Sequence, residues 1–165
     1  MTDKEFMEYA LGLTLGDGID PPIGAIVTDE NGNIIGQAAN TRQAEISAIA
    51  HAEVKAIEMA CKARESWHLV GCTIYVTLEP CPMCMGAIIN SRIDRVVFGA
   101  YNPKAGCCGS IINLADLPFN HKPQITGGIM AEECGAVLSE FFKKRRTQTG
   151  STRGQDSSQA RRRFR

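Results

Sequence analysis

Two patterns of apolar residues alternate along the chain. Short runs of apolar and β-branched residues predict buried strands, and apolar residues three or four positions apart predict helices that pack by one face. The predicted strands are 23–27, 33–39, 72–78, 95–99 and 124–126. The predicted helices are 3–15, 50–62, 82–89, 111–117 and 131–146. This order favours an α/β fold with a central mixed five-stranded sheet between two layers of helices, a three-layer α-β-α architecture.

Turn-forming residues separate these elements. Gly12, Gly16 and Gly18 weaken the first helix and are expected to end it early. The pair Asn31-Gly32 supplies the positive φ angles of a hairpin turn, so the first two strands are expected to pair. Pro82 suits the first turn of the third helix. The turn signals therefore agree with the periodic pattern.

Charge divides the chain into a body and an end. Residues 1–142 hold nine Lys/Arg and 17 Asp/Glu, whereas residues 143–165 hold nine Lys/Arg and one Asp, which gives net charges of −8 and +8. We assign residues 1–146 to one folded domain, which this length can support. Residues 147–165, almost without apolar side chains, are expected to form a basic disordered tail. Such an end suggests a polyanionic partner such as nucleic acid, and a tail that only improves solubility is the alternative.

Composition favours a cytoplasmic protein that contacts no membrane. No run of about 18 apolar residues is available for a membrane span, and the segment Met1–Glu5 lacks the basic and apolar parts of a signal peptide. Seven cysteines, an odd number, fit a reducing compartment in which thiols bind metals or pack in the core.

One group of residues carries the chemistry. His51 precedes Glu53 by two positions, and Cys81 and Cys84 form a Cys-x-x-Cys pair near the start of the third helix. Zinc favours nitrogen and thiolate ligands, and one His with two Cys leaves the fourth tetrahedral position open for water. A nearby carboxylate can then move protons on that water. The trio is therefore the candidate ligand set for one Zn²⁺ per chain, and Glu53 is the candidate catalytic residue.

These residues also have a purely structural interpretation. The cysteines could be buried thiols, and Glu53 could cap a helix or join an ion pair. A Cys-x-x-Cys pair alone would not decide the question, but its combination with His-x-Glu and a proline before the first Cys favours the zinc site. The neighbouring pair Cys107-Cys108 has no His or spaced Cys close to it, so we interpret it as core packing and not as a second metal site.

With the motifs placed at helix starts, the chain resembles the cytidine deaminase-like superfamily, and more narrowly bacterial tRNA-specific adenosine deaminases. The resemblance covers about residues 5–146 and includes the runs 22–27, 75–84 and 91–100. The features that narrow it are Asn120-His121, the run 128–134 and the terminal run 141–146. The resemblance implies a cytidine deaminase-like fold and the zinc-dependent hydrolytic deamination of adenosine to inosine at the wobble position of a tRNA anticodon.

The resemblance also implies roles for individual residues. Glu53 would pass protons from water to the purine ring and to the leaving ammonia. The residues implied to contact the substrate are Asn40, Ala52, Asn102, Phe142, Lys143, Lys144, Arg145 and Arg146. Phe142 would stack on an unpaired base or else belong to the core, and the four basic residues would contact phosphates of the anticodon stem-loop. Family members are homodimers, so a homodimer is expected.

Two other functions compete with this one. A deaminase of a free nucleobase or nucleoside, of the guanine or cytosine type, would share the zinc site but would have no use for a basic terminal helix. A non-catalytic, zinc-stabilised RNA-binding module would keep the zinc and the basic helix but would need no carboxylate at Glu53. Turnover of a free base would favour the first, and ammonia release from tRNA would exclude the second.

Overall fold

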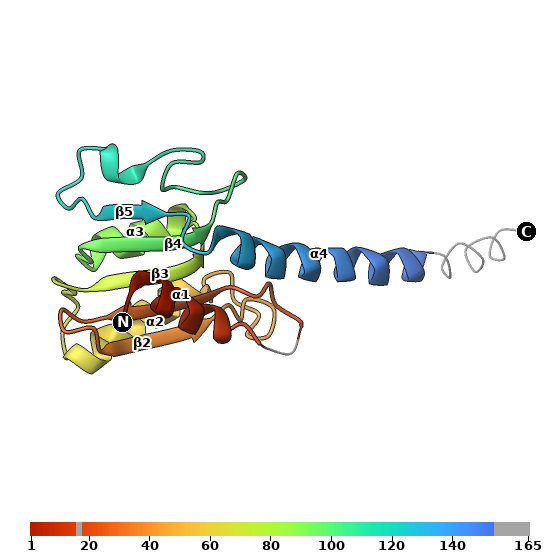
Figure 1. The fold of residues 1–165 in the computed structure, drawn as a ribbon, viewed down its shortest axis with the longest axis horizontal. Coiled ribbons are helices and arrows are strands. Elements are labelled where there is room, and N and C mark those ends of the chain that lie inside the picture. The colour runs from red at the N-terminus through yellow and green to blue at the C-terminus, as the bar shows by residue number, and fades with distance from the viewer. Residues whose placement is uncertain (16–17, 154–165) are drawn as a thin grey trace, which may run out of the picture.

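The computed structural model describes residues 1–15 and 18–153, which form one sheet flanked by helices (Figure 1). The strands are β1 (Gly24–Thr28), β2 (Ile34–Ala39), β3 (Thr73–Leu78), β4 (Arg95–Ala100) and β5 (Gln124–Gly127). The helices are α1 (Asp3–Gly12), α2 (Ala52–Arg64), α3 (Pro82–Asn90) and α4 (Ala131–Arg153), with a 3-10 turn, η1 (Leu114–Asp116). The predicted α/β class and the order of the elements are confirmed.

The sheet is mixed, with the strand order β2-β1-β3-β4-β5. Strand β1 pairs antiparallel with β2 and β3, whereas β3, β4 and β5 run parallel to one another. The β1–β2 pair is the predicted hairpin, in which the Asp29 carboxylate accepts hydrogen bonds from the amides of Asn31 (2.9 Å) and Asn33 (2.8 Å). Of the pair predicted to have positive φ angles, only Gly32 has one (+81°), a conformation that glycine adopts without strain, and the prediction was wrong for Asn31. Local turn chemistry therefore sets this pairing.

Alternate residues along the strands face the two helix layers. On one face, Ile74 and Val76 of β3 belong to a buried cluster that includes side chains of α2 and α3. On the other face, Tyr75 of β3 clusters with Phe6 of α1 and Cys134 of α4. Because successive strand residues point to opposite faces, one strand contributes to both halves of the core. The three-layer α-β-α architecture is confirmed.

Boundaries differ from the prediction where capping decides them. Helix α1 ends at Gly12 and not at residue 15, because the amide of Leu13 turns back to carbonyls within the helix. Helix α2 begins at Ala52, two residues later than predicted, because His51 has extended backbone angles (φ −78°, ψ 149°) as the N-cap residue. The helix predicted over 111–117 is only the three-residue turn η1.

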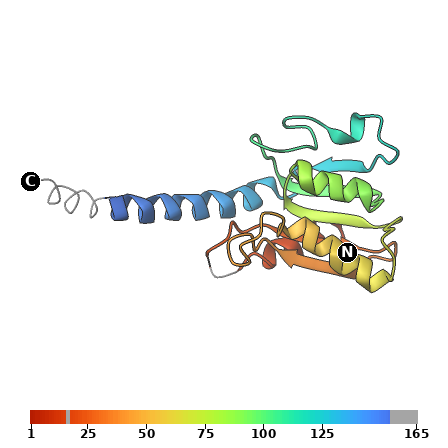
Figure 2. The ribbon, with the colours of Figure 1, turned by 180° about the vertical axis from the view of Figure 1, so that it is seen from behind.

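Helix α4 is longer than predicted and projects away from the sheet (Figures 1 and 2). We expected the helix to end at residue 146 and the chain to be disordered beyond it, but α4 continues through 147–153, so the expectation was wrong there. The hydroxyl of Thr147 donates to the carbonyl of Lys144 (2.7 Å), which shows how a polar side chain finds a partner within the helix. Residues 154–165, the rest of the predicted tail, lie outside the described residues. None of the helices in the described ranges has the length and apolar character needed to cross a bilayer.

The strand directions determine where a site can form. Strands β3 and β4 are parallel and end at the same edge of the sheet. Antiparallel β1 starts at that edge, and β2 ends there, since Ala25 pairs with both Val76 of β3 and Ala38 of β2. The connections after β2, β3 and β4 therefore converge at one edge, where α2 and α3 also begin. Open α/β sheets commonly bind ligands at such an edge.

Candidate active site

A cavity of about 50 Å³ lies at this edge of the sheet. Its lining combines the start of β1, the end of β2, the start of α2, the end of β3 and the loop after β4, and consists of Ile23, Asn40, His51, Ala52, Glu53, Leu78, Glu79, Cys81 and Asn102. The volume holds an ion and a few waters, so a larger substrate can place only its reacting part inside. The lining thus brings together two of the three candidate metal ligands, the candidate catalytic residue and three of the predicted substrate contacts. The third candidate ligand, Cys84, lies outside the lining, with its Sγ atom 3.4 Å from the Nδ1 atom of His51.

Three ligand atoms at the cavity have the spacing of a zinc site. In the described ranges, His51, Cys81 and Cys84 are the only three side chains that could hold a metal together, with ligand atoms all within 4.8 Å of one another. The Nδ1 atom of His51 lies 3.7 Å from the Sγ atom of Cys81 and 3.4 Å from that of Cys84. Tetrahedral zinc with its usual bond lengths requires an N···S separation of about 3.6 Å. The residues present therefore fit zinc.

Helix starts put these ligands in place. His51 is the N-cap residue of α2 and Cys81 is that of α3, and neither side chain makes a capping hydrogen bond. Pro82 begins α3, where its missing amide hydrogen costs nothing, and Cys84 follows in the first turn. The side chains at both helix starts therefore remain available to a metal.

Without a metal, only one of the two thiols of the Cys-x-x-Cys pair ionises readily. A hydrogen bond from the Cys84 thiol, together with the neighbouring His51, lowers the pKa of Cys81 to about 4. The same hydrogen bond, together with burial, raises the pKa of Cys84 far above its usual range. The hydrogen bond with Cys81 also raises the pKa of His51. A second thiolate at this place therefore needs a compensating cation, which a zinc dication supplies.

Glu53 is the buried acid of the cavity. It lies in the first turn of α2 with only 4% of its surface exposed. Burial raises the pKa of its carboxyl group to about 7, opposed by a hydrogen bond from its own backbone amide. A carboxyl group with a pKa near neutrality can accept a proton in one step and donate it in the next. The geometry and the electrostatics both suit the predicted catalytic role.

Two asparagine amides line the same cavity. The Nδ2 atom of Asn40 donates to the carbonyl of Pro21 (3.3 Å), and its Oδ1 atom accepts from the amide of Arg42 (3.3 Å). The Oδ1 atom of Asn102 accepts from the amide of Lys104 (3.3 Å). Surrounding backbone therefore holds both amides in place before any substrate arrives.

Glu79 is a cavity residue that the sequence analysis missed. Its side chain is 1% exposed and accepts hydrogen bonds from the amides of Asn102 (2.9 Å), Cys108 (3.0 Å) and Ser110 (3.0 Å), and from the Ser110 hydroxyl. Burial opposes ionisation of the carboxyl group, but these hydrogen bonds outweigh it and lower the pKa. The only signal in the sequence was a glutamate at the end of an apolar strand.

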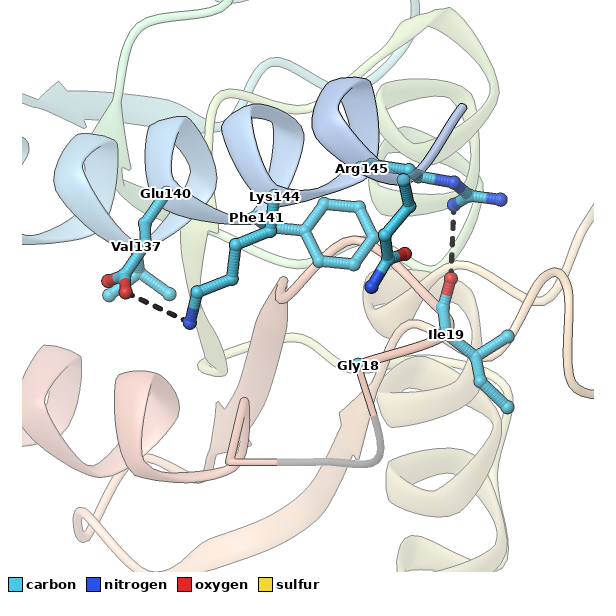
Figure 3. A pocket seen from close by; sticks show the side chains of 8 residues that line it. Gly18, Ile19, Val137, Glu140, Phe141, Lys144 and Arg145 are labelled. Atoms are coloured by element: carbon cyan, nitrogen blue, oxygen red, sulfur yellow. Dashed lines mark hydrogen bonds and ion pairs between the residues drawn. The ribbon is translucent and has the colours of Figure 1, made fainter. Parts of the chain in front are cut away.

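Helix α4 forms a groove of about 520 Å³ with residues 18–19 (Figure 3). In this groove Lys144 pairs with Glu140 (3.0 Å), and Arg145 donates a hydrogen bond to the carbonyl of Ile19 (3.1 Å). The guanidinium of Arg145 also lies 5.7 Å from the ring centre of Phe141. Two of the four basic residues predicted to contact phosphates are thus engaged within the protein, and one of them ties α4 to the loop before β1.

A second groove, of about 590 Å³, lies between α4 and the loop after β4. Its lining residues are Lys104, Ser139, Phe142, Arg145, Arg146 and Thr149. Phe142 is 47% exposed, so the alternative that it belongs to the core is wrong. The sequence analysis missed Lys104 because only the fold brings it next to the basic cluster of α4. Lys143 lines neither groove.

The neighbouring cysteines outside the motif pack in the core, as predicted. Cys107 is 2% exposed and Cys108 is 8% exposed, and both belong to the cluster beneath α2 and α3. The Sγ atom of Cys108 lies 3.6 Å from the sulfur of Met85. Burial raises the pKa of both thiols, that of Cys108 to about 12, which keeps them protonated.

Comparison with known proteins adds independent observations. Residues 1–100 match the model of the cytidine and deoxycytidylate deaminase zinc-binding region. A tRNA-specific adenosine deaminase of Bacillus subtilis is 50% identical over 133 residues, which are 80% of this chain and 82% of the relative. A structure from studies of A-to-I editing by tRNA:A34 deaminases at the wobble position of transfer RNA is 36% identical, has a TM-score of 0.76, and is matched over 81% of this chain and 99% of that one.

A guanine deaminase structure from Bacillus subtilis is also similar, with 31% identity and a TM-score of 0.60 over 88% of this chain and 95% of that one. It shares the general fold but matches less well than the tRNA-editing structure. The region matched by the deaminase model contains His51, Glu53, Cys81 and Cys84. The tRNA-specific relative aligns over most of both chains. The chain therefore belongs to the cytidine and deoxycytidylate deaminase family, within its tRNA-specific adenosine deaminase branch.

Proposed function

We propose that the protein converts adenosine to inosine at the wobble position of a tRNA anticodon by zinc-dependent hydrolysis. One observation carries the proposal: a cavity with a His/Cys/Cys ligand set and the buried Glu53 lies next to a groove of basic side chains. The two are joined by the loop after β4, which places Asn102 in the cavity and Lys104 in the groove. The similarity to tRNA-specific adenosine deaminases supports this substrate.

Glu53 would perform the proton transfers of the reaction. Zinc bound at His51, Cys81 and Cys84 supplies the Lewis acidity that makes water a nucleophile near neutral pH. Hydrolysis adds water at the purine carbon that bears the amino group and releases ammonia. Glu53 would accept a proton from the water and deliver it to the adjacent ring nitrogen. It would then take the remaining proton from the added hydroxyl group and donate it to the amine, which leaves as ammonia. One zinc ion per chain is proposed, since the described ranges contain a single ligand group.

The anticodon loop would use the cavity and the groove together. Asn40 and Asn102 would hydrogen-bond the target nucleoside next to Ala52, while the exposed ring of Phe142 would stack on a neighbouring unpaired base. The predicted phosphate contacts are Lys143, Lys144, Arg145 and Arg146, to which the fold adds Lys104. Phosphate contacts orient RNA without selecting its sequence. We assign the larger share of the RNA affinity to the basic residues that line the groove.

A homodimer in the cytoplasm completes the proposal. The side chains of Ile46, Ile49 and Ile111 are 94%, 61% and 61% exposed, and apolar side chains of this kind are often covered in a subunit interface. The anticodon stem-loop as substrate supports a cytoplasmic location, where tRNA is available.

The proposal predicts strong preference for RNA over free bases. We expect a tRNA anticodon stem-loop with a wobble adenosine to be deaminated with a kcat/KM at least about 100-fold above that of free adenosine or guanine, because contacts remote from the reacting base contribute only with RNA. The measurement is ammonia release with each substrate, together with inosine detection by sequencing of total bacterial tRNA after incubation. Equal turnover of free guanine would support the competing function that the guanine deaminase neighbour suggests.

The groove predicts which basic residues matter most. The double variant Lys104→Ala/Arg146→Ala should lower stem-loop affinity by roughly 30-fold at 0.1 M salt and reduce the salt slope of binding by about 1.4 to 1.8, the effect of two lost phosphate contacts. The comparison variant, Lys143→Ala/Lys144→Ala, removes the same charge from predicted phosphate contacts that lie outside this groove, and should lower affinity by the smaller factor of less than about threefold. Affinity measured against salt concentration compares the two. Equal losses would mean that the RNA does not occupy the groove.

A further inference from the structure

The carboxylate of Glu79 is the centre of the loop that follows β4. One oxygen accepts from the amide of Asn102 (2.9 Å) and from the Ser110 hydroxyl. The other accepts from the amides of Cys108 (3.0 Å) and Ser110 (3.0 Å). All four donors are neutral and belong to the loop itself. A single buried carboxylate thus joins the first part of the loop to its last part.

The same loop supplies the substrate side of the site. Asn102 lines the cavity and Lys104 lines the groove against α4. The loop is also packed tightly on Glu79, because a Cβ atom at Gly106 would lie 2.4 Å from the carboxyl carbon of Glu79. Only glycine therefore allows this close approach.

The segment that carries Glu79 also carries the metal ligand Cys81. The Glu79 amide donates to the carbonyl of Ala100 (2.8 Å), and the carbonyl of Pro80 accepts from the amide of Cys107 (2.8 Å). Backbone contacts therefore attach the strand end to the base of the loop, and the Glu79 carboxylate holds the loop's interior. The Glu79 side chain is thus one of the contacts that set the position of Asn102 relative to the metal ligands.

We propose that Glu79 is a positioning residue. It fixes the loop after β4, so that Asn102 and Lys104 can contact the RNA while the target base lies at the metal ligands. The proposal rests on the proposed function for the identity of the substrate. It assigns Glu79 no contact with the reacting base and no proton transfer.

The test is Glu79→Gln, which keeps the size of the side chain but replaces one acceptor oxygen by a donor NH₂ group. Whichever way the side-chain amide of the glutamine is oriented, at least one backbone N–H group of the loop loses its acceptor. We expect the KM for the anticodon stem-loop to rise by roughly tenfold, while kcat falls by less than about threefold and the zinc content stays at the wild-type level. Amide hydrogen exchange at Asn102, Cys108 and Ser110 should accelerate.

Asp29→Asn is the matched control. The Asp29 carboxylate also accepts from two backbone amides across a turn, but it follows β1 at the opposite edge of the sheet. This variant should leave the KM and the exchange of the loop amides unchanged. A second variant, Ser110→Ala, removes only the hydroxyl donor to Glu79 and should raise the KM in the same direction by a smaller factor.

The outcomes separate this proposal from the proposed function. If amide exchange in the loop is faster in Glu79→Gln but the wild-type protein is inactive on the stem-loop, the positioning role of Glu79 is supported and the proposed substrate is contradicted. Unchanged KM and unchanged loop exchange in an active Glu79→Gln protein would overturn the positioning role. If Glu79→Gln does not fold, Ser110→Ala decides by the same two measurements.

Discussion

Replacing Glu53 by alanine should lower the kcat for the stem-loop by at least about 100-fold, the lower end for the loss of a general acid and base. Glu53 lines the cavity, is buried, and is not a member of the His/Cys/Cys ligand group. Zinc content and stem-loop affinity should therefore remain within about twofold of the wild type. Single-turnover kinetics with inosine detection measures the first quantity, and metal analysis and RNA titration measure the others.

Glu58→Ala provides the comparison for this experiment. Glu58 lies on the same helix with an exposed side chain, so its loss should leave kcat unchanged. A Glu53→Ala protein with nearly normal turnover would contradict the proton-transfer role. A protein that loses zinc would instead show that Glu53 supports the metal site.

Replacing Cys84 by alanine should abolish zinc binding and turnover together. Two ligands, one nitrogen and one thiolate, remain, and affinity for zinc should fall by more than about 100-fold. The expected zinc content of the purified variant is far below the one ion per chain proposed for the wild type. Competition with a coloured chelator measures the affinity, and ammonia release from the stem-loop measures turnover.

Cys72→Ala is the control for the loss of a buried thiol. Cys72 is fully buried, but it precedes β3 and therefore lies at the edge of the sheet opposite the cavity. In the metal-free state, Cys72→Ala and Cys84→Ala should lose similar amounts of the free energy of unfolding. Cys72→Ala should nevertheless keep its zinc. Full zinc and full activity in Cys84→Ala would remove Cys84 from the ligand set.

The sequence predicted the fold, and the grouping of the candidate zinc ligands, well because their signals are local. The run of β-branched and aromatic residues in β3 and the Asn31-Gly32 turn are visible within a few residues, and each decides a feature of the sheet. The zinc ligands lie in two short motifs at helix starts, so their types and spacing already indicate the chemistry. The fold brings His51 next to Cys81 and Cys84 in a geometry that fits zinc, and the ligand assignment itself stays a prediction.

What the sequence could not predict depends on contacts between distant segments. Glu79 acts on a loop more than 20 residues further along the chain, as its bond to Asn102 shows. Lys104 joins the α4 residues only through the packing of the loop against that helix. The predicted end of α4 was wrong for another reason, because the scarcity of apolar residues after Arg146 does not prevent hydrogen bonds within the helix, such as that of Thr147.

The projection of α4 gives a neutral protein a large electric dipole. The acidic excess lies in residues 1–142, while Lys143, Lys144, Arg145 and Arg146 follow one another along the projecting helix. In the field of a polyanion such a molecule experiences a torque that turns the helix toward the nucleic acid and the body away from it. Encounters in the wrong orientation are then repelled before contact. The orientation should be fastest at low ionic strength, since salt screens charges separated by more than about 10 Å.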